Sequence, residues 1–112
     1  MLLSCDRDDS TQQQEEEALN RTIKSIENKV YSIDCSNAAD WKIIGVGTKA
    51  CGGSLSYLPY HKSVETNVLP MVEEYNSAMA AYNKKWNVVS DCSLTVMPRS
   101  VECINGKATL KY

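Results

Sequence analysis

Five cysteines are the residues of this 112-residue chain whose side chains have the most distinctive chemistry. They are Cys5, Cys35, Cys51, Cys92 and Cys103. The last four are separated by 16, 41 and 11 positions, so none has the close neighbour that a zinc site requires. Four such cysteines in a short domain are typical of two disulfide bonds formed in an oxidising compartment. We therefore expect two bridges and no metal site.

Strand geometry favours one pairing of these four cysteines. Pro98-Arg99 has the composition of a tight turn between two antiparallel strands, and such a turn sets Cys92 diagonal to Cys103. Diagonal residues lie roughly 7 Å or more apart, at or beyond the reach of a disulfide. We favour Cys51–Cys92 and Cys35–Cys103, and a bulge that joins Cys92 to Cys103 stays as the alternative.

The same turn, Met97-Pro98-Arg99-Ser100, suggests a binding activity. Small serine-protease inhibitors present a basic residue to the protease on a rigid loop that disulfides brace. Preorganisation of such a loop lowers the cost of binding. One hypothesis is therefore inhibition of a trypsin-like protease through Arg99, with Pro98 and Ser100 on either side of it.

No group of residues has the spacing of a known catalytic motif. The single histidine, His61, lies between Tyr60 and Lys62 and is interpreted as a surface or packing residue. Glu73 and Glu74 are adjacent, so on a helix they point about 100° apart and cannot act as an acid–base pair. We expect a non-enzymatic protein that needs no cofactor. An enzyme with a pocket around His61 is the third hypothesis.

The charges are distributed unevenly along the chain. Residues 6–17 contain six acidic residues and one basic residue, although the net charge of the whole chain is only −2. An acidic head on a mildly basic body is typical of a solvated tail joined to a folded domain. We expect an anchor and flexible acidic tether over residues 1–17 and one domain over residues 18–112. The charge gives no indication of nucleic-acid binding.

Two amphipathic helices are expected to position the cysteines. Thr11 can begin a capping box, and apolar residues then recur at spacings of three and four as far as Ile33. A longer helix is expected to begin with Thr66 or Asn67 as its cap and Pro70 in its first turn. Its apolar stripe comprises Val68, Val72, Tyr75, Met79, Tyr82 and Trp86.

Strands are expected on both sides of the longer helix. Residues 41–46 and 55–60 are expected as two strands before it, and Pro59 ends the second of them. The runs 94–97, 101–104 and 108–112 predict a three-stranded meander, with Asn105-Gly106 as one of its turns. The fold class is therefore α+β. A long amphipathic helix packs on a small antiparallel sheet, stapled by disulfides, with an N-terminal helix and an acidic tether.

The start of the chain resembles the processing signal of an exported bacterial lipoprotein. Leu2-Leu3-Ser4-Cys5 is similar to a lipobox, in which a peptidase cleaves before the cysteine and the cysteine is then acylated. The resemblance implies a signal peptide, acyl chains such as palmitate on Cys5 and a firm anchor in the bilayer. A full signal peptide has a charged start and a longer apolar run than Leu2-Leu3, so whether one was trimmed stays open. The acidic residues after Cys5 resemble the surface-export signal of Bacteroidetes lipoproteins. This implies a place on the outer membrane, and the surface and periplasmic faces both stay open.

Two further resemblances are to the same group of proteins. Asp9-Ser10-Thr11 resembles the Bacteroidetes O-glycosylation sequon, which makes Ser10 a candidate modification site. Segments similar to those of small uncharacterised lipoproteins are Cys51-Gly52-Gly53, Glu74-Tyr75-Asn76 and Ser90-Asp91-Cys92. The main functional prediction is an extracytoplasmic, lipid-anchored, non-enzymatic module. Its partner is a protein or a glycan, and the sequence leaves its oligomeric state open.

Overall fold

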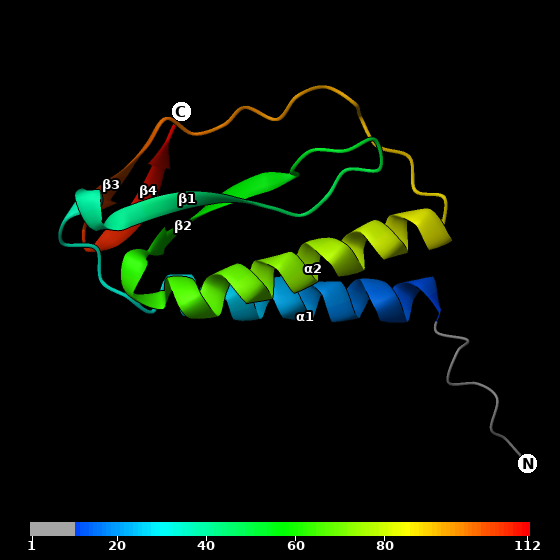
Figure 1. Ribbon diagram of the computed structural model, residues 1–112, viewed down its shortest axis with the longest axis horizontal. Coiled ribbons are helices and arrows are strands. Elements are labelled where there is room, and N and C mark those ends of the chain that lie inside the picture. Colours follow the sequence, from blue (N-terminus) through cyan, green and yellow to red (C-terminus); the bar gives the residue numbers. More distant parts are fainter. Residues whose placement is uncertain (1–10) are drawn as a thin grey trace, which may run out of the picture.

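Two helices and two β-hairpins make up the computed structural model, which describes residues 11–112 (Figure 1). The helices are α1 (Gln12–Val30) and α2 (Glu65–Lys85). The strands of the first antiparallel hairpin are β1 (Trp41–Val46) and β2 (Ser56–His61), and those of the second are β3 (Ser100–Ile104) and β4 (Lys107–Lys111). Short 3₁₀ turns, η2 (Ala38–Asp40) and η3 (Lys62–Val64), precede β1 and α2. The predicted α+β class is confirmed.

The elements lie in layers (Figure 1). The two helices pack side by side in opposite directions, and the β1–β2 hairpin covers one side of the pair. The β3–β4 hairpin contacts β1 and β2 at one end of the molecule. From the end of α2 the chain returns to β3 along the outer side of the β1–β2 hairpin, away from the helices.

Helix α1 begins at the expected cap. The Thr11 hydroxyl accepts a hydrogen bond from the Gln14 amide at 3.0 Å, and the Gln14 side chain accepts one from the Thr11 amide at 3.0 Å. Residues 12–17, which the charge pattern placed in the tether, form the first turns of this helix. The helix ends at Val30, so Ile33 lies beyond it and packs against the core from the following loop.

Helix α2 begins earlier than predicted. Its first residue is Glu65, its N-cap is Val64, and neither Thr66 nor Asn67 caps it. The 3₁₀ turn η3 leads directly into the helix, and this connection decides where α2 begins. Pro70 therefore lies in the second turn, where it removes one backbone hydrogen bond of the helix.

The main core lies between the helices and the β1–β2 hairpin. The side chains of Ile26, Val30 and Val68 are fully buried there, and those of Val72 and Tyr75 are nearly so. The predicted stripe of α2 thus faces the core as far as Tyr82, whereas Trp86 lies just beyond the helix as its C-cap. Burial raises the pKa of the Tyr75 hydroxyl above its ordinary value.

A second, smaller core lies between β1 and the β3–β4 hairpin. Its buried members are Cys35, Trp41, Val101 and Ala108. The Cys35 amide also donates to the Gly106 carbonyl oxygen at 2.8 Å, which ties the loop after α1 to the tight turn of this hairpin. Asn105 and Gly106 both have positive φ, as the predicted turn requires.

Three predictions about the strands and their turns are wrong. Residues 94–97 form no strand, so the predicted meander is a two-stranded hairpin. Pro98-Arg99 is not a turn, because the chain continues straight into β3. Pro59 does not end β2 but lies within it, opposite Ile43. Strand β2 is bonded only to β1, and such an edge strand tolerates a proline without an amide hydrogen.

Candidate interaction site

Two of the predicted sites, Cys5 and Ser10, lie outside the residues that the structure describes. Acylation of Cys5 and glycosylation of Ser10 therefore stay predictions. The other predicted residues lie within the described chain and are Cys35, Cys51, Cys92, Cys103, Pro98, Arg99, Ser100 and His61.

The four described cysteines form the two favoured pairs. Cys35 and Cys103 join the loop after α1 to β3, with their Cα atoms 5.2 Å apart. Cys51 and Cys92 join the β1–β2 loop to the segment after α2, with their Cα atoms 5.9 Å apart. Both distances are usual for disulfides. The two bridges indicate an oxidising, extracytoplasmic location.

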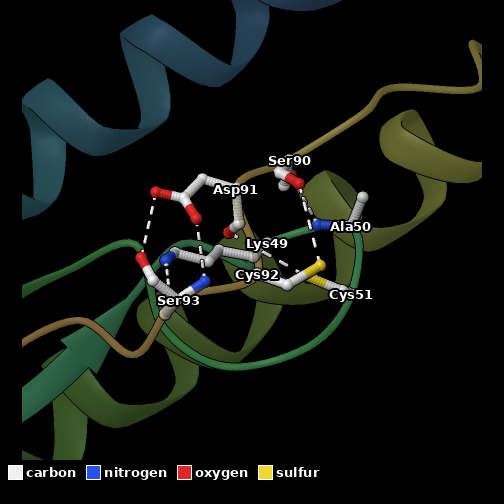
Figure 2. Close-up of a disulfide and its surroundings, with 7 residues drawn as sticks. All are labelled: Lys49, Ala50, Cys51, Ser90, Asp91, Cys92 and Ser93. Atoms are coloured by element: carbon white, nitrogen blue, oxygen red, sulfur yellow. Dashed lines mark hydrogen bonds between the residues drawn. A yellow bond between two sulfur atoms is a disulfide. The ribbon is translucent and has the colours of Figure 1, made fainter.

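Hydrogen bonds connect the two chain segments on both sides of the Cys51–Cys92 bridge (Figure 2). On one side of the bridge, the Ala50 amide donates to Ser90 Oγ at 2.8 Å. On the other side, the Lys49 ammonium group donates to the carbonyl oxygen of Ser93. The β1–β2 loop therefore fixes the chain on both sides of Cys92.

Asp91 lies next to this bridge and is exposed to solvent. Its carboxylate accepts hydrogen bonds from the Ser93 amide at 2.8 Å and from the Ser93 hydroxyl at 2.9 Å (Figure 2). These two bonds, the amide's first, lower the pKa of the Asp91 carboxyl below its ordinary value. Asp91 is therefore a negative charge at a defined position on the surface.

The residues that follow, 93–97, are called the outer segment below. Three of its side chains are apolar and exposed: Leu94 is 95%, Val96 is 68% and Met97 is 61% accessible. Thr95 points inward, and its hydroxyl donates to the Ser54 carbonyl oxygen at 2.9 Å. The alternation of Leu94, Thr95 and Val96 is that of a β-strand with one face on its own domain.

The backbone of the outer segment has no strand beside it. The nearest backbone-to-backbone hydrogen bonds are made by Val88 and Arg99, and between them, within residues 11–112, there are none. The amides of residues 94–97 also lack a side-chain acceptor in the described part of the chain. Such groups bond to water or to an added strand. Residues 94–97 of the outer segment are therefore a strand-like stretch with unpaired edges.

Arg99 begins the return of the chain to the second hairpin. Its amide donates to the Lys111 carbonyl oxygen at 2.7 Å, and Ser100 is the first residue of β3. Its guanidinium group lies 3.4 Å from the Tyr112 carbonyl oxygen. Pro98 is buried. The residues of the predicted inhibitory loop are therefore bound along β4 and do not form a protruding turn.

His61 has a local structural role. Its Nδ1 accepts a hydrogen bond from the Ser63 amide at 3.0 Å, which caps η3. Its ring packs edge-on against Trp41 at a centroid distance of 5.4 Å. Its Nε2 lies 3.9 Å from a carboxylate oxygen of Asp40. These contacts agree with the interpretation of His61 as a packing residue.

In the described chain, no three His, Cys, Asp or Glu side chains lie together in a way that could hold a metal ion. Neither α1 nor α2 combines the length and the apolar character needed to span a bilayer.

The outer segment was not predicted as a surface. The composition of residues 94–97 predicted a β-strand, but one that is paired within a meander. The exposure of Leu94 and Val96 follows from the positions of the two hairpins, and no local sequence signal reports it. No family model, no curated protein and no solved structure matches this chain.

Proposed function

We propose that this protein is an exported, non-enzymatic interaction module that binds a protein partner through the outer segment. The observation that carries the proposal is the combination of exposed Leu94, Val96 and Met97 with unpaired backbone amides. Exposed apolar groups mark sites that bind proteins or membranes. A bilayer cannot satisfy backbone amides, whereas an extended protein segment can. These amides therefore favour a protein over a membrane.

The proposal includes a lipid anchor at Cys5. Four of the five cysteines are paired with one another, which leaves the Cys5 thiol for acylation. The lipobox-like Leu2-Leu3-Ser4-Cys5 and the acidic residues after it support a bilayer partner and exposure on the outer membrane.

Mass spectrometry of protein from native cells tests the anchor. The expected result is cleavage before Cys5 with acyl chains on that residue, and release of the Cys5→Ser variant from the membrane fraction. An unmodified Cys5 thiol in membrane-free protein contradicts the anchor. The same spectrum shows whether Ser10 carries a glycan.

Site-specific photo-cross-linking tests the binding surface. A photoreactive residue replaces Val96 in one variant and Lys24, which is exposed on α1, in a matched control. Cells of the native host that carry each variant are then irradiated. We expect a discrete protein adduct from position 96 and none from position 24. Equal adducts from both positions, or none from either, contradict the proposal.

Protease inhibition through Arg99 is the alternative from the sequence, and the observed geometry gives it less support. Inhibitory loops protrude, whereas the Arg99 amide is bonded to Lys111 and Pro98 is buried. An inhibition assay against trypsin-like enzymes, with Arg99→Ala as its control, is expected to show no tight binding. Inhibition that disappears in Arg99→Ala would restore this alternative.

A further inference from the structure

Strand β1 has a free edge on the side away from β2. It pairs with β2 alone, so its alternate residues direct their backbone groups toward no ladder partner. The Trp41 amide donates to the Ala38 carbonyl oxygen and so does not bond to β2. Ile43 lies opposite Pro59, which has no amide hydrogen to donate to it. The odd-numbered residues of β1 therefore direct their backbone groups to the free edge.

The open positions on this edge are Ile43 and Gly45. Within residues 11–112, their amides have neither a backbone nor a side-chain acceptor, and both residues are partly exposed. The amide of the next odd-numbered residue, Gly47, donates to Asn76 Oδ1 of α2 at 2.7 Å, which closes the edge there. The edge between η2 and Asn76 is therefore a short template for one added strand.

Two clefts flank this edge. The helix-side cleft has a volume of about 470 Å³, and its walls include Ile44, Gly45, Leu69, Pro70 and Glu73. The hairpin-side cleft has a volume of about 550 Å³, and its walls include Trp41, Ile43, Met97, Arg99 and Ser100. Ile44 packs against the main core and Ile43 against the smaller one, so the clefts lie on opposite faces of β1. They would receive alternate side chains of an added strand.

The two clefts have opposite charges. Glu73 is the single charged residue among those that line the helix-side cleft, and it forms no ion pair within residues 11–112. The hairpin-side cleft is lined by two cations and no acid. One of them, Lys42, is bonded to Glu65 at 2.8 Å. The other, Arg99, has one hydrogen bond in the described chain, at 3.4 Å to Tyr112, and so has donors for a ligand.

We propose that the free edge of β1 binds an extended peptide segment in which a basic residue is next to an acidic one. The peptide backbone bonds to Ile43 and Gly45. The peptide residue opposite Ile44 directs its side chain into the helix-side cleft, where an apolar stem covers the wall of α2 and the cation meets Glu73. The neighbouring residue, opposite Ile43, directs a carboxylate toward Arg99.

This site is distinct from the surface of the proposed function. Leu94 and Val96 line neither cleft, so the inference does not rest on their binding a partner. Val96→Lys is therefore expected to leave peptide binding at β1 unchanged.

Hydrogen exchange measured by nuclear magnetic resonance tests the open edge. In the free protein, the amides of Ile43 and Gly45 should exchange faster than those of Ile44 and Val46, which point toward β2. Slow exchange at all of these positions overturns the proposal. Protection of Ile43 and Gly45 that grows with protein concentration, without any peptide, identifies a second copy as the occupant and also overturns it.

Selection from a displayed library of random linear peptides, with the oxidised full chain as bait, tests the ligand. We expect the recovered peptides to share a Lys or Arg next to an Asp or Glu in a β-forming stretch. A synthetic peptide of this kind should protect the amides of Ile43 and Gly45 from exchange. Recovered peptides without the charged pair, or no recovered peptide, overturn the proposal.

Two adjacent glutamates of α2 give a matched pair of variants. Both are exposed, but Glu73 lines the helix-side cleft and Glu74 lines neither cleft. Glu73→Lys is expected to raise the dissociation constant of a selected peptide about tenfold, and Glu74→Lys to leave it unchanged. A peptide whose basic residue is replaced by Glu should recover binding to the Glu73→Lys variant, which a misfolded variant could not do. Equal effects of the two substitutions, or no recovery, overturn the proposal.

Discussion

Glu15 connects the start of α1 to the end of α2. Its carboxylate accepts a hydrogen bond from the Trp86 indole at 2.9 Å and forms an ion pair with Lys85. The bond from Lys85, and after it the bond from Trp86, lowers the pKa of the Glu15 carboxyl below its ordinary value of 4.5. The charged form of Glu15 therefore stabilises the folded state.

This pKa shift predicts a pH dependence of stability. Because the folded-state pKa is lowered, the stabilisation is present above pH 4.5 and is lost as the pH falls through the lowered value. Glu15→Gln should therefore lower the denaturation midpoint near neutral pH. On acidification, the midpoint of this variant should fall less than that of the original protein. Denaturant titrations at several pH values, followed by tryptophan fluorescence, measure this. Glu16→Gln, an exposed neighbour, is the control, and equal pH profiles for both variants would contradict the assignment.

Gly47 is required by both its backbone and its surroundings. Its φ is +80°, and a Cβ atom there would lie 2.9 Å from Leu55 Cδ1. Gly52 has a φ of +101° but open space around it. Gly47→Ala should therefore lower the free energy of unfolding by about 3 kcal/mol, and Gly52→Ala by only about 1 kcal/mol. Urea unfolding of the two variants measures both free energies. Equal losses would show that the contact with Leu55 adds no destabilisation of its own.

At the scale of elements, the α1–α2 pair supports the sheets. Ile26 is fully buried at this contact, together with Val30 and Val68. The β1–β2 hairpin has only two strands, and a two-stranded sheet is marginal without packing against another element. The stability of the hairpin therefore depends on this helix contact.

Truncation of Ile26 tests this dependence. Ile26→Ala should lower the free energy of unfolding by about 3 kcal/mol, because it leaves a cavity between the helices and the hairpin. Lys24→Ala, on the exposed side of α1, should change it by less than about 0.5 kcal/mol. Chemical denaturation monitored by far-ultraviolet circular dichroism measures both. A small loss for Ile26→Ala would mean that the helix pair contributes little to the core.

At the scale of the whole molecule, the two disulfides differ in their surroundings. Cys35 is buried in the smaller core, and its bridge joins residues 68 positions apart. Cys51 and Cys92 are both exposed, and their bridge joins residues 41 positions apart. The Cys35–Cys103 bridge therefore closes the larger loop and also packs in a core. The Cys51–Cys92 bridge is accessible to reductants.

Two measurements follow from this difference. Replacement of both Cys35 and Cys103 by alanine should lower the free energy of unfolding by about 4 kcal/mol, and replacement of both Cys51 and Cys92 by about 3 kcal/mol. Under mild reductant, alkylation and mass analysis should find Cys51 and Cys92 modified first. Modification of Cys35 before them would contradict the role given to burial.

Parts of the fold that depend on neighbours in sequence were predictable. The capping box at Thr11 is a contact over three residues, and the Asn105-Gly106 turn depends on two residues with positive φ. The start of α2 was not predictable, because it follows from the 3₁₀ turn after β2. The third strand over residues 94–97 was not predictable either, since a strand needs a partner from elsewhere in the chain.

Short-range features of the chain predict the α+β class, the apolar faces of the two helices and the use of four cysteines in bridges. These features are the periodicity of apolar residues, the helix caps and the spacing of the cysteines. The packing of the two hairpins, which no short-range feature specifies, leaves residues 94–97 without a partner strand and Leu94 and Val96 exposed. It also decided that Arg99 is bonded to β4. The physical reason is that strand pairing and exposure depend on where distant elements pack, and the composition of a segment does not contain that information.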